Sequence, residues 1–362
     1  MTPIFALLLF GHTVTCVPFF SFASHSQSYS SNIPTVDIQY KYEDKDYTIP
    51  SIIDLNTEVS LVFSQKCKGK NKCTAEELTT VEVGIPDGEK YNDSSYDPAN
   101  EFLGYFYDFQ VKLRDLTQQH KILTITEGKG EQEYEASGRL GLGFGDADYK
   151  IVDKLFDGMD DHKTIYIYEG EYKHRVQDND GRIAPVKQSG EVSFGKEIDS
   201  CKDLKYVQAL EHDGKPWWQV EADITIGNLT FEKQKVAFNP SRRTFVNSKT
   251  FDTYFKTADV DSLADLPKFT IKIGNNEYVM EAKDYAEERK KDDKTYYSAF
   301  IGKVATNDYD FVFGYEFLQK KCLALRRNNN KYEVGLSPSA GNNVKIGSFV
   351  LILSVLVGLK FF

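Results

Sequence analysis

Short segments of alternating polar and apolar residues recur along nearly the whole chain, and they constrain its fold more than any other feature. They are rich in β-branched and aromatic residues and are separated by Gly, Asn and Asp, a pattern typical of strands joined by turns. The predicted strands begin at Thr35, Ser60, Tyr105, Lys121, Thr164, Glu191, Trp217, Phe269 and Asp310. Helical signals are few and short, such as those from Ile151 and from Ser248, with Ser248 as the expected cap of the second. The sequence therefore predicts a mainly β protein.

The arrangement of these segments is doubled. In the first half an apolar strand runs into Asp54, and an apolar stretch interrupted by glycines follows at Gly138–Gly143. In the second half an apolar strand runs into Asn239, and a similar stretch follows at Phe311–Gly314. The two turn residues lie about half the chain apart, which predicts two related lobes.

Six segments, in the same order, resemble the pepsin family of aspartic peptidases. They are Ile52–Phe63, Ser137–Phe144, Ser189–Asp199, Trp217–Asn228, Phe311–Leu325 and Lys331–Pro338. The resemblance implies a mainly β, bilobal pepsin-like aspartic protease fold, with pseudo-twofold-related lobes around a central cleft and no cofactor. It assigns residues 33–195 to an N-terminal lobe and residues 196–338 to a C-terminal lobe.

The catalytic positions depart from the family pattern. Each lobe of the family carries an Asp-Thr/Ser-Gly turn, and two closely spaced carboxylates share one proton in order to act as acid and base. Here Asp54 is followed by Leu-Asn-Thr, and Asn239-Pro-Ser replaces the second turn. An alternative alignment places Phe238 at the second position, and neither alignment supplies a carboxylate. Asp54 is thus a relic of the first catalytic Asp, and Asn239 replaces the second.

The residues that support the family's two acids are also altered. In the family the hydroxyl residue after each Asp reaches across to the backbone of the other lobe. Leu55 has no hydroxyl, and Pro240 has no N–H to donate. The family also has a tyrosine on a flap over the cleft. Tyr91 and Tyr96 both lie in the expected stretch, without the usual neighbouring glycine.

Both ends of the chain carry apolar runs. Residues 4–10 indicate a secretory signal peptide over residues 1–23, although cleavage after Cys16 is also plausible. Residues 346–359 are apolar and follow the small residues Ser339-Ala340-Gly341. This segment, 339–362, is predicted to be either a GPI-anchor signal or a short transmembrane segment. We therefore expect a secretory-pathway protein, extracellular or tethered to the cell surface.

Removal of the signal segment leaves four cysteines, which suggests two disulfides in an extracellular protein. Our expected pairing is Cys67–Cys73 and Cys201–Cys322, although four cysteines allow three pairings. Two glycosylation sequons begin at Asn92 and Asn228. No His or Cys cluster has metal-ligand spacing, so no metal is expected.

The formal net charge of −10 disfavours binding to nucleic acid.

Taken together, the resemblance and the altered catalytic positions favour a catalytically inactive pepsin-like monomer. Its cleft is expected to bind a peptide or protein, and its tail is expected to associate with a membrane. One alternative is a divergent but active aspartic-type endopeptidase that uses another carboxylate. A second alternative is a structural or adhesion protein with a vestigial cleft.

Overall fold

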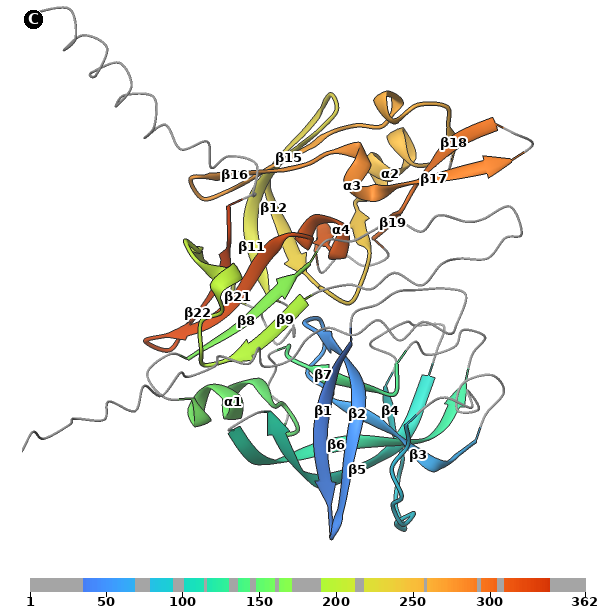
Figure 1. Cartoon of the computed structure of the whole chain (residues 1–362), viewed down its shortest axis with the longest axis vertical. Helices are drawn as coiled ribbons and strands as arrows, with labels where there is room; N and C mark the ends of the chain where they lie inside the picture. The colour runs from blue at the N-terminus through green and yellow to red at the C-terminus, as the bar shows by residue number, and fades with distance from the viewer. Residues whose placement is uncertain are drawn as a thin grey trace, which may run out of the picture.

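A computed structural model describes residues 35–68, 79–93, 101–113, 116–129, 136–143, 148–159, 163–170, 190–211, 218–256, 259–291, 294–304 and 309–338. The predicted signal segment, 1–23, and the C-terminal segment, 339–362, lie outside these residues. The described residues form two β lobes with a shared sheet between them (Figure 1). The predicted mainly β, bilobal fold class is confirmed.

The N-terminal lobe is a seven-stranded sheet that closes into a barrel. Its strands follow the order β1-β2-β7-β3-β6-β5-β4, and β1 also pairs with β5. They are β1 (Thr35–Tyr42), β2 (Lys45–Asp54), β3 (Leu61–Lys68), β4 (Tyr91–Asp93), β5 (Glu101–Leu113), β6 (Leu116–Lys129) and β7 (Gly138–Gly141). Successive side chains of a strand point to opposite faces of the sheet, so Ile38 and Tyr40 on β1 are buried, while Gln39 between them is exposed.

The C-terminal lobe contains a second seven-stranded sheet, which curls into a half-barrel. Its order is β16-β15-β11-β12-β20-β13-β19. The strands are β11 (Gln219–Ile226), β12 (Leu229–Phe238), β13 (Thr244–Val246), β15 (Phe269–Ile273), β16 (Asn276–Met280), β19 (Ile301–Lys303) and β20 (Phe311–Phe313). A smaller sheet of β14 (Asp259–Val260), β18 (Lys294–Ala299) and β17 (Ala286–Lys291) extends from this lobe (Figure 1).

The same strand arrangement occurs once in each lobe. In the N-terminal lobe β2 pairs in parallel with β7, and β3 pairs antiparallel with β7 and parallel with β6. In the C-terminal lobe β12 pairs in parallel with β20, and β13 pairs antiparallel with β20 and parallel with β19. Asp54 ends β2, and Asn239 directly follows β12. The doubled sequence pattern therefore corresponds to a doubled structural motif.

A five-stranded sheet joins the two halves of the chain. Its order is β10 (Lys205–Gln208), β22 (Lys331–Leu336), β21 (Lys321–Asn328), β8 (Thr164–Glu169) and β9 (Gly190–Phe194). The antiparallel pairing of β8 with β21 connects the first half of the chain to the second. Trp218 adds a further link, because its fully buried ring donates a hydrogen bond of 2.7 Å from Nε1 to the Leu142 carbonyl.

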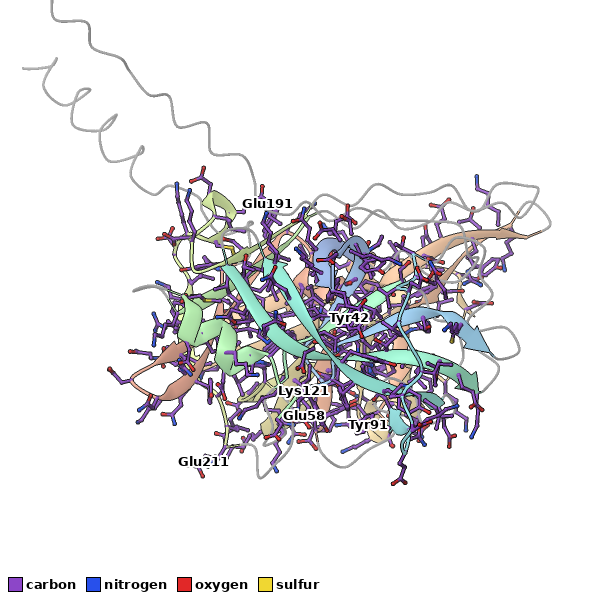
Figure 2. All side chains as sticks on the ribbon, turned by 90° about the horizontal axis from the view of Figure 1, so that it is seen from below. Tyr42, Glu58, Tyr91, Lys121, Glu191 and Glu211 are labelled. Atoms are coloured by element: carbon purple, nitrogen blue, oxygen red, sulfur yellow. A yellow bond between two sulfur atoms is a disulfide. The ribbon has the colours of Figure 1, made fainter. Side chains whose placement is uncertain are left out.

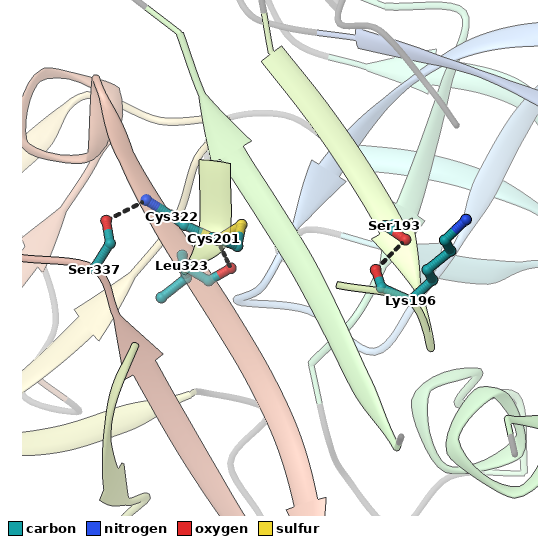
Figure 3. Close-up of a disulfide and its surroundings, with 6 residues drawn as sticks. All are labelled: Ser193, Lys196, Cys201, Cys322, Leu323 and Ser337. Atoms are coloured by element: carbon teal, nitrogen blue, oxygen red, sulfur yellow. Dashed lines mark hydrogen bonds between the residues drawn. A yellow bond between two sulfur atoms is a disulfide. The ribbon is translucent and has the colours of Figure 1, made fainter. Parts of the chain in front are cut away.

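A disulfide links this sheet to a short helix. Cys201 lies in the 3₁₀ helix η1 (Asp199–Cys201) and is bonded to Cys322 on β21, as expected (Figure 3). The Cys322 N–H also donates to the Ser337 hydroxyl at 2.8 Å. Both cysteines are fully buried. Cys67 is also disulfide-bonded, but Cys73 lies outside the described residues, so the Cys67–Cys73 pairing stays a prediction.

The helices are short. They are α1 (Val152–Gly158), α2 (Ser248–Tyr254), α3 (Ala282–Tyr285), α4 (Tyr315–Leu318) and the 3₁₀ helix η2 (Leu263–Asp265). The predicted Ser248 cap is wrong by one residue, because the side chain of Asn247 accepts the Thr250 N–H at 2.9 Å. Asn247 has the extended backbone that lets a cap reach the third helical residue. Among the described residues, no helix has both the length and the apolar composition to cross a membrane.

Candidate functional site

The Asp54 turn is held by its own backbone. The Asn56 N–H donates to Asp54 Oδ1 at 2.9 Å, which forms a local turn closed by the carboxylate. The Asp54 carbonyl accepts the Leu142 N–H at 2.8 Å, beyond the end of β7. These two contacts place the carboxylate at the end of β2, and the side chain has no exposed surface.

The Asn239 turn repeats this geometry in the other lobe. The Ser241 N–H donates to Asn239 Oδ1 at 3.0 Å, two residues along as in the Asp54 turn. The Asn239 N–H donates to the Phe313 carbonyl on β20 at 3.0 Å. An asparagine forms this turn as well as an aspartate does, because only the side-chain oxygen is required. The asparagine at position 239 therefore holds the turn without supplying a carboxyl group.

The two turns meet at the junction between the lobes. Asn239 Nδ2 donates to Asp54 Oδ1 at 2.8 Å, and both residues are completely buried. The structure thus brings together the two positions that the sequence singled out. An amide can donate to a carboxylate, but it cannot bind or release a proton near neutral pH. This pair cannot share a proton as two carboxyl groups do.

Arg242 completes the surroundings of Asp54. One of its terminal nitrogens lies 3.6 Å from Asp54 Oδ2, and its side chain is 16% exposed. A buried carboxylate needs a compensating positive charge, since burial of an unpaired charge is costly. In the described residues, the hydrogen-bond and ion-pair partners of the Asp54 side chain are all nitrogen atoms. Sequence analysis missed Arg242, although its place three residues after Asn239 was the available signal.

A hydroxyl also crosses between the lobes, from a residue of the second turn to which the sequence analysis gave no supporting role. The predicted loss of support at Leu55 and Pro240 concerned the positions directly after each turn residue. Ser241, one position later, donates from Oγ to the Ile53 carbonyl at 2.5 Å. Ile53 immediately precedes Asp54, so this bond ties the Asn239 turn to the backbone of the Asp54 turn.

A glycine lies against each turn. The N–H of Gly141 donates to the Ser60 hydroxyl at 3.0 Å, and the N–H of Gly314 donates to the Thr244 hydroxyl at 3.2 Å. A Cβ added at Gly314 would lie 2.0 Å from the Arg242 carbonyl oxygen. Only a residue without a side chain allows the backbone to approach the turn this closely.

Gly314→Ala is therefore expected to lower the free energy of unfolding by about 2–3 kcal/mol, because the backbone of the Asn239 turn must shift to make room. Urea denaturation followed by circular dichroism measures this loss. Gly84→Ala is the matched control, since a Cβ there has no atom within 4 Å. Equal unfolding midpoints for the two variants would contradict the prediction.

Tyr91, one of the two flap candidates, is part of an aromatic cluster in the N-terminal lobe. Its ring packs against Phe106 and Tyr149, and the two tyrosine hydroxyls lie 3.1 Å apart. Burial raises the pKa of Tyr149, with further contributions from Tyr91 and Glu58. Glu58 and Tyr91 lie on the same side of the lobe (Figure 2). The other candidate, Tyr96, lies outside the described residues.

The remaining predicted sites are at the surface. Asn92 is exposed on β4, and Asn228 is exposed in the turn between β11 and β12. The Asn228 Oδ1 accepts a hydrogen bond of 2.5 Å from the Tyr254 hydroxyl. In the described part of the chain, no group of three or more His, Cys, Asp and Glu is arranged to hold a metal ion.

Comparison with known proteins gives a distant relative. The chain is 24% identical over 238 residues to plasmepsin IV of Plasmodium falciparum, with the same match in two isolates of that species. The match covers 60% of this chain, and the chain spans about half the length of these curated relatives. No family model matches the chain. Plasmepsin IV is a pepsin-family aspartic protease, and this distant similarity, like the two β lobes, is consistent with a pepsin-like fold.

Proposed function

We propose that this chain is a catalytically inactive pepsin-like protein. The observation that carries the proposal is the hydrogen bond from Asn239 Nδ2 to Asp54 Oδ1, at the position where peptide hydrolysis needs a second carboxyl group. General acid and general base groups each contribute about 10²–10⁴-fold to a hydrolytic rate. An amide supplies neither, so the expected loss of activity is severe.

The surroundings of Asp54 also support inactivity. Arg242 lies 3.6 Å from Oδ2, so the second oxygen of the Asp54 carboxylate is engaged in an ion pair. Complete burial of Asp54 and Asn239 is a second argument, because hydrolysis requires an attacking water beside the acid. Amide, cation and burial all favour a structural role for Asp54, in which it joins the two lobes.

Purified protein is expected to show no pepstatin-sensitive peptide cleavage between pH 3 and pH 7. The measurement is the hydrolysis of a mixed peptide library, followed by mass spectrometry, with Asp54→Asn as the matched variant. Wild type and variant are expected to give the same background. Pepstatin-sensitive cleavage that disappears in Asp54→Asn would overturn the proposal and favour a divergent active endopeptidase.

We further propose that the protein binds a peptide or protein ligand between its lobes, as a surface-tethered monomer of the secretory pathway. The partly exposed Arg242 at the lobe junction supports ligand binding there. The apolar runs at 4–10 and 346–359 and the Cys201–Cys322 disulfide support the secretory pathway and the surface tether. Ligand that binds only the folded state raises the melting temperature. A peptide library that causes no thermal shift would favour a structural or adhesion protein instead.

A further inference from the structure

Two glutamates are buried together, away from the Asp54 site. Glu316 lies on α4 and is completely buried, and Glu169 ends β8 with 4% of its surface exposed. The Oε1 atom of each has no hydrogen-bond partner in the described structure. The helix α4 packs against both β8 and β21 of the shared sheet (Figure 1). The proposed function gives neither glutamate a role.

Glu316 is connected to the segment that carries Asn239 and Arg242. Its Oε2 accepts the Thr244 N–H at 2.7 Å, and Thr244, the first residue of β13, lies two residues after Arg242. The N–H of the neighbouring Tyr315 donates to the Arg242 carbonyl at 2.9 Å. A displacement of α4 therefore pulls on the backbone of both Arg242 and Thr244.

The charged groups around Glu316 do not neutralise the pair. Arg243, before β13, favours the charged form of Glu316, but less strongly than burial opposes it. Lys321, on β21, donates from Nζ to the Phe317 carbonyl at 2.7 Å and lies over the Phe317 ring. From α3, Asp284 acts on Lys321, and β20 contributes no titratable side chain. Glu169 lies opposite Lys321 in the β8–β21 register, and its interaction with Glu316 is repulsive, since like charges repel strongly in a buried site.

Burial makes both carboxyl groups hold their protons at unusually high pH. It raises the pKa of Glu316 to about 7 and raises the pKa of Glu169 well above its usual range, with a further contribution from Glu316. A raised folded-state pKa gives stability that is complete below the unfolded value of about 4.5 and is lost as the pH rises through the folded value. Ionised Glu316 would accept a stronger hydrogen bond from Thr244, but two buried like charges cost more than this gain.

We propose that the Glu169–Glu316 pair is a proton-dependent switch on the Asn239–Arg242 turn. With both carboxyl groups protonated, α4 stays packed and holds the turn against Asp54. Loss of these protons toward neutral pH brings two negative charges together beneath α4, and the helix then opens to admit water. The backbone from Arg242 to Thr244 loosens with it. The switch does not depend on whether the lobe junction binds a ligand.

Backbone hydrogen exchange in the full-length protein tests this inference between pH 5 and pH 8, after correction for the intrinsic exchange rates. In wild type, protection of Thr244 and Tyr315 is expected to fall by about 70-fold between pH 5 and pH 8 if Glu316 alone ionises, since its pKa moves from 4.5 to about 7. In Glu316→Gln the amide oxygen can still accept from Thr244, and the pH dependence of protection is expected to become much weaker, because only Glu169 of the pair still titrates. Glu221→Gln, at an exposed position on β11, is expected to behave as wild type.

Two results would overturn the switch. One is protection at Thr244 that does not change with pH in wild type, and the other is pH dependence that persists unchanged in Glu316→Gln. If Glu316→Gln fails to fold, Glu169→Gln provides the second test. Removal of the Glu169 charge is expected to shift the loss of protection at Thr244 to higher pH, and an unchanged profile would contradict the inference.

Discussion

Arg139→Met is expected to lower the free energy of unfolding by about 3–5 kcal/mol, because it leaves the charge of Asp93 buried without its cation. Arg139 on β7 has no exposed surface, and its guanidinium forms an ion pair with Asp93 on β4, which is 2% exposed. Its Nε also donates to the Val59 carbonyl at 3.0 Å. Arg139 thus connects the edge strand β4 to β7, which pairs with β2 at the Asp54 turn.

Urea denaturation of Arg139→Met, Asp93→Asn and the double variant measures this contribution. The double variant is expected to be more stable than Arg139→Met, because removal of both charges leaves no unpaired ion. Lys45→Met is the matched control, since the ion pair of Lys45 with Glu82 is more than half exposed and is expected to contribute little. An Arg139→Met variant as stable as Lys45→Met would contradict the prediction.

Removal of the Cys201–Cys322 disulfide is expected to cost about 5 kcal/mol on the chain-entropy model, because the bond closes a loop whose ends are 121 residues apart. The loop contains most of the C-terminal lobe. Without the bond, the unfolded chain gains many extended conformations, whereas the folded state keeps the packing of η1 against β21. The variant for this test is Cys201→Ala/Cys322→Ala.

Thermal and urea unfolding of the double alanine variant, with and without a reducing agent, separate this disulfide from the one at Cys67. Reductant is expected to destabilise wild type strongly and the variant only slightly, because a longer loop contributes more than a short one. A variant whose unfolding midpoint equals that of oxidised wild type would show that the bond contributes nothing.

The doubled motif could be predicted from the sequence, and with it the meeting of Asp54 and Asn239. An apolar strand that runs into a turn residue, followed later by an apolar stretch and a glycine, occurs in both halves. The parallel pairings of β2 with β7 and of β12 with β20 then place both turn residues at the junction. Such regular strand patterns survive in the sequence because each strand buries one face.

The contacts around Asp54 were harder to predict. Arg242 and Ser241 act across the junction on residues about half a chain away, and sequence order alone does not show such contacts. The Glu169–Glu316 pair left no signal at all, since a glutamate between apolar residues is more often exposed. Its burial follows from the packing of α4 on the shared sheet, which exists only once both halves have folded.

The shared sheet limits how this architecture can be rearranged. Six consecutive residue pairs join β8 to β21, so strands from the two halves form a single seam. A hybrid chain that combined one half of this protein with the other half of a relative would have to match side-chain volumes along the whole seam. Neither half can therefore be replaced independently by the corresponding half of a relative, even though each contains its own copy of the turn motif.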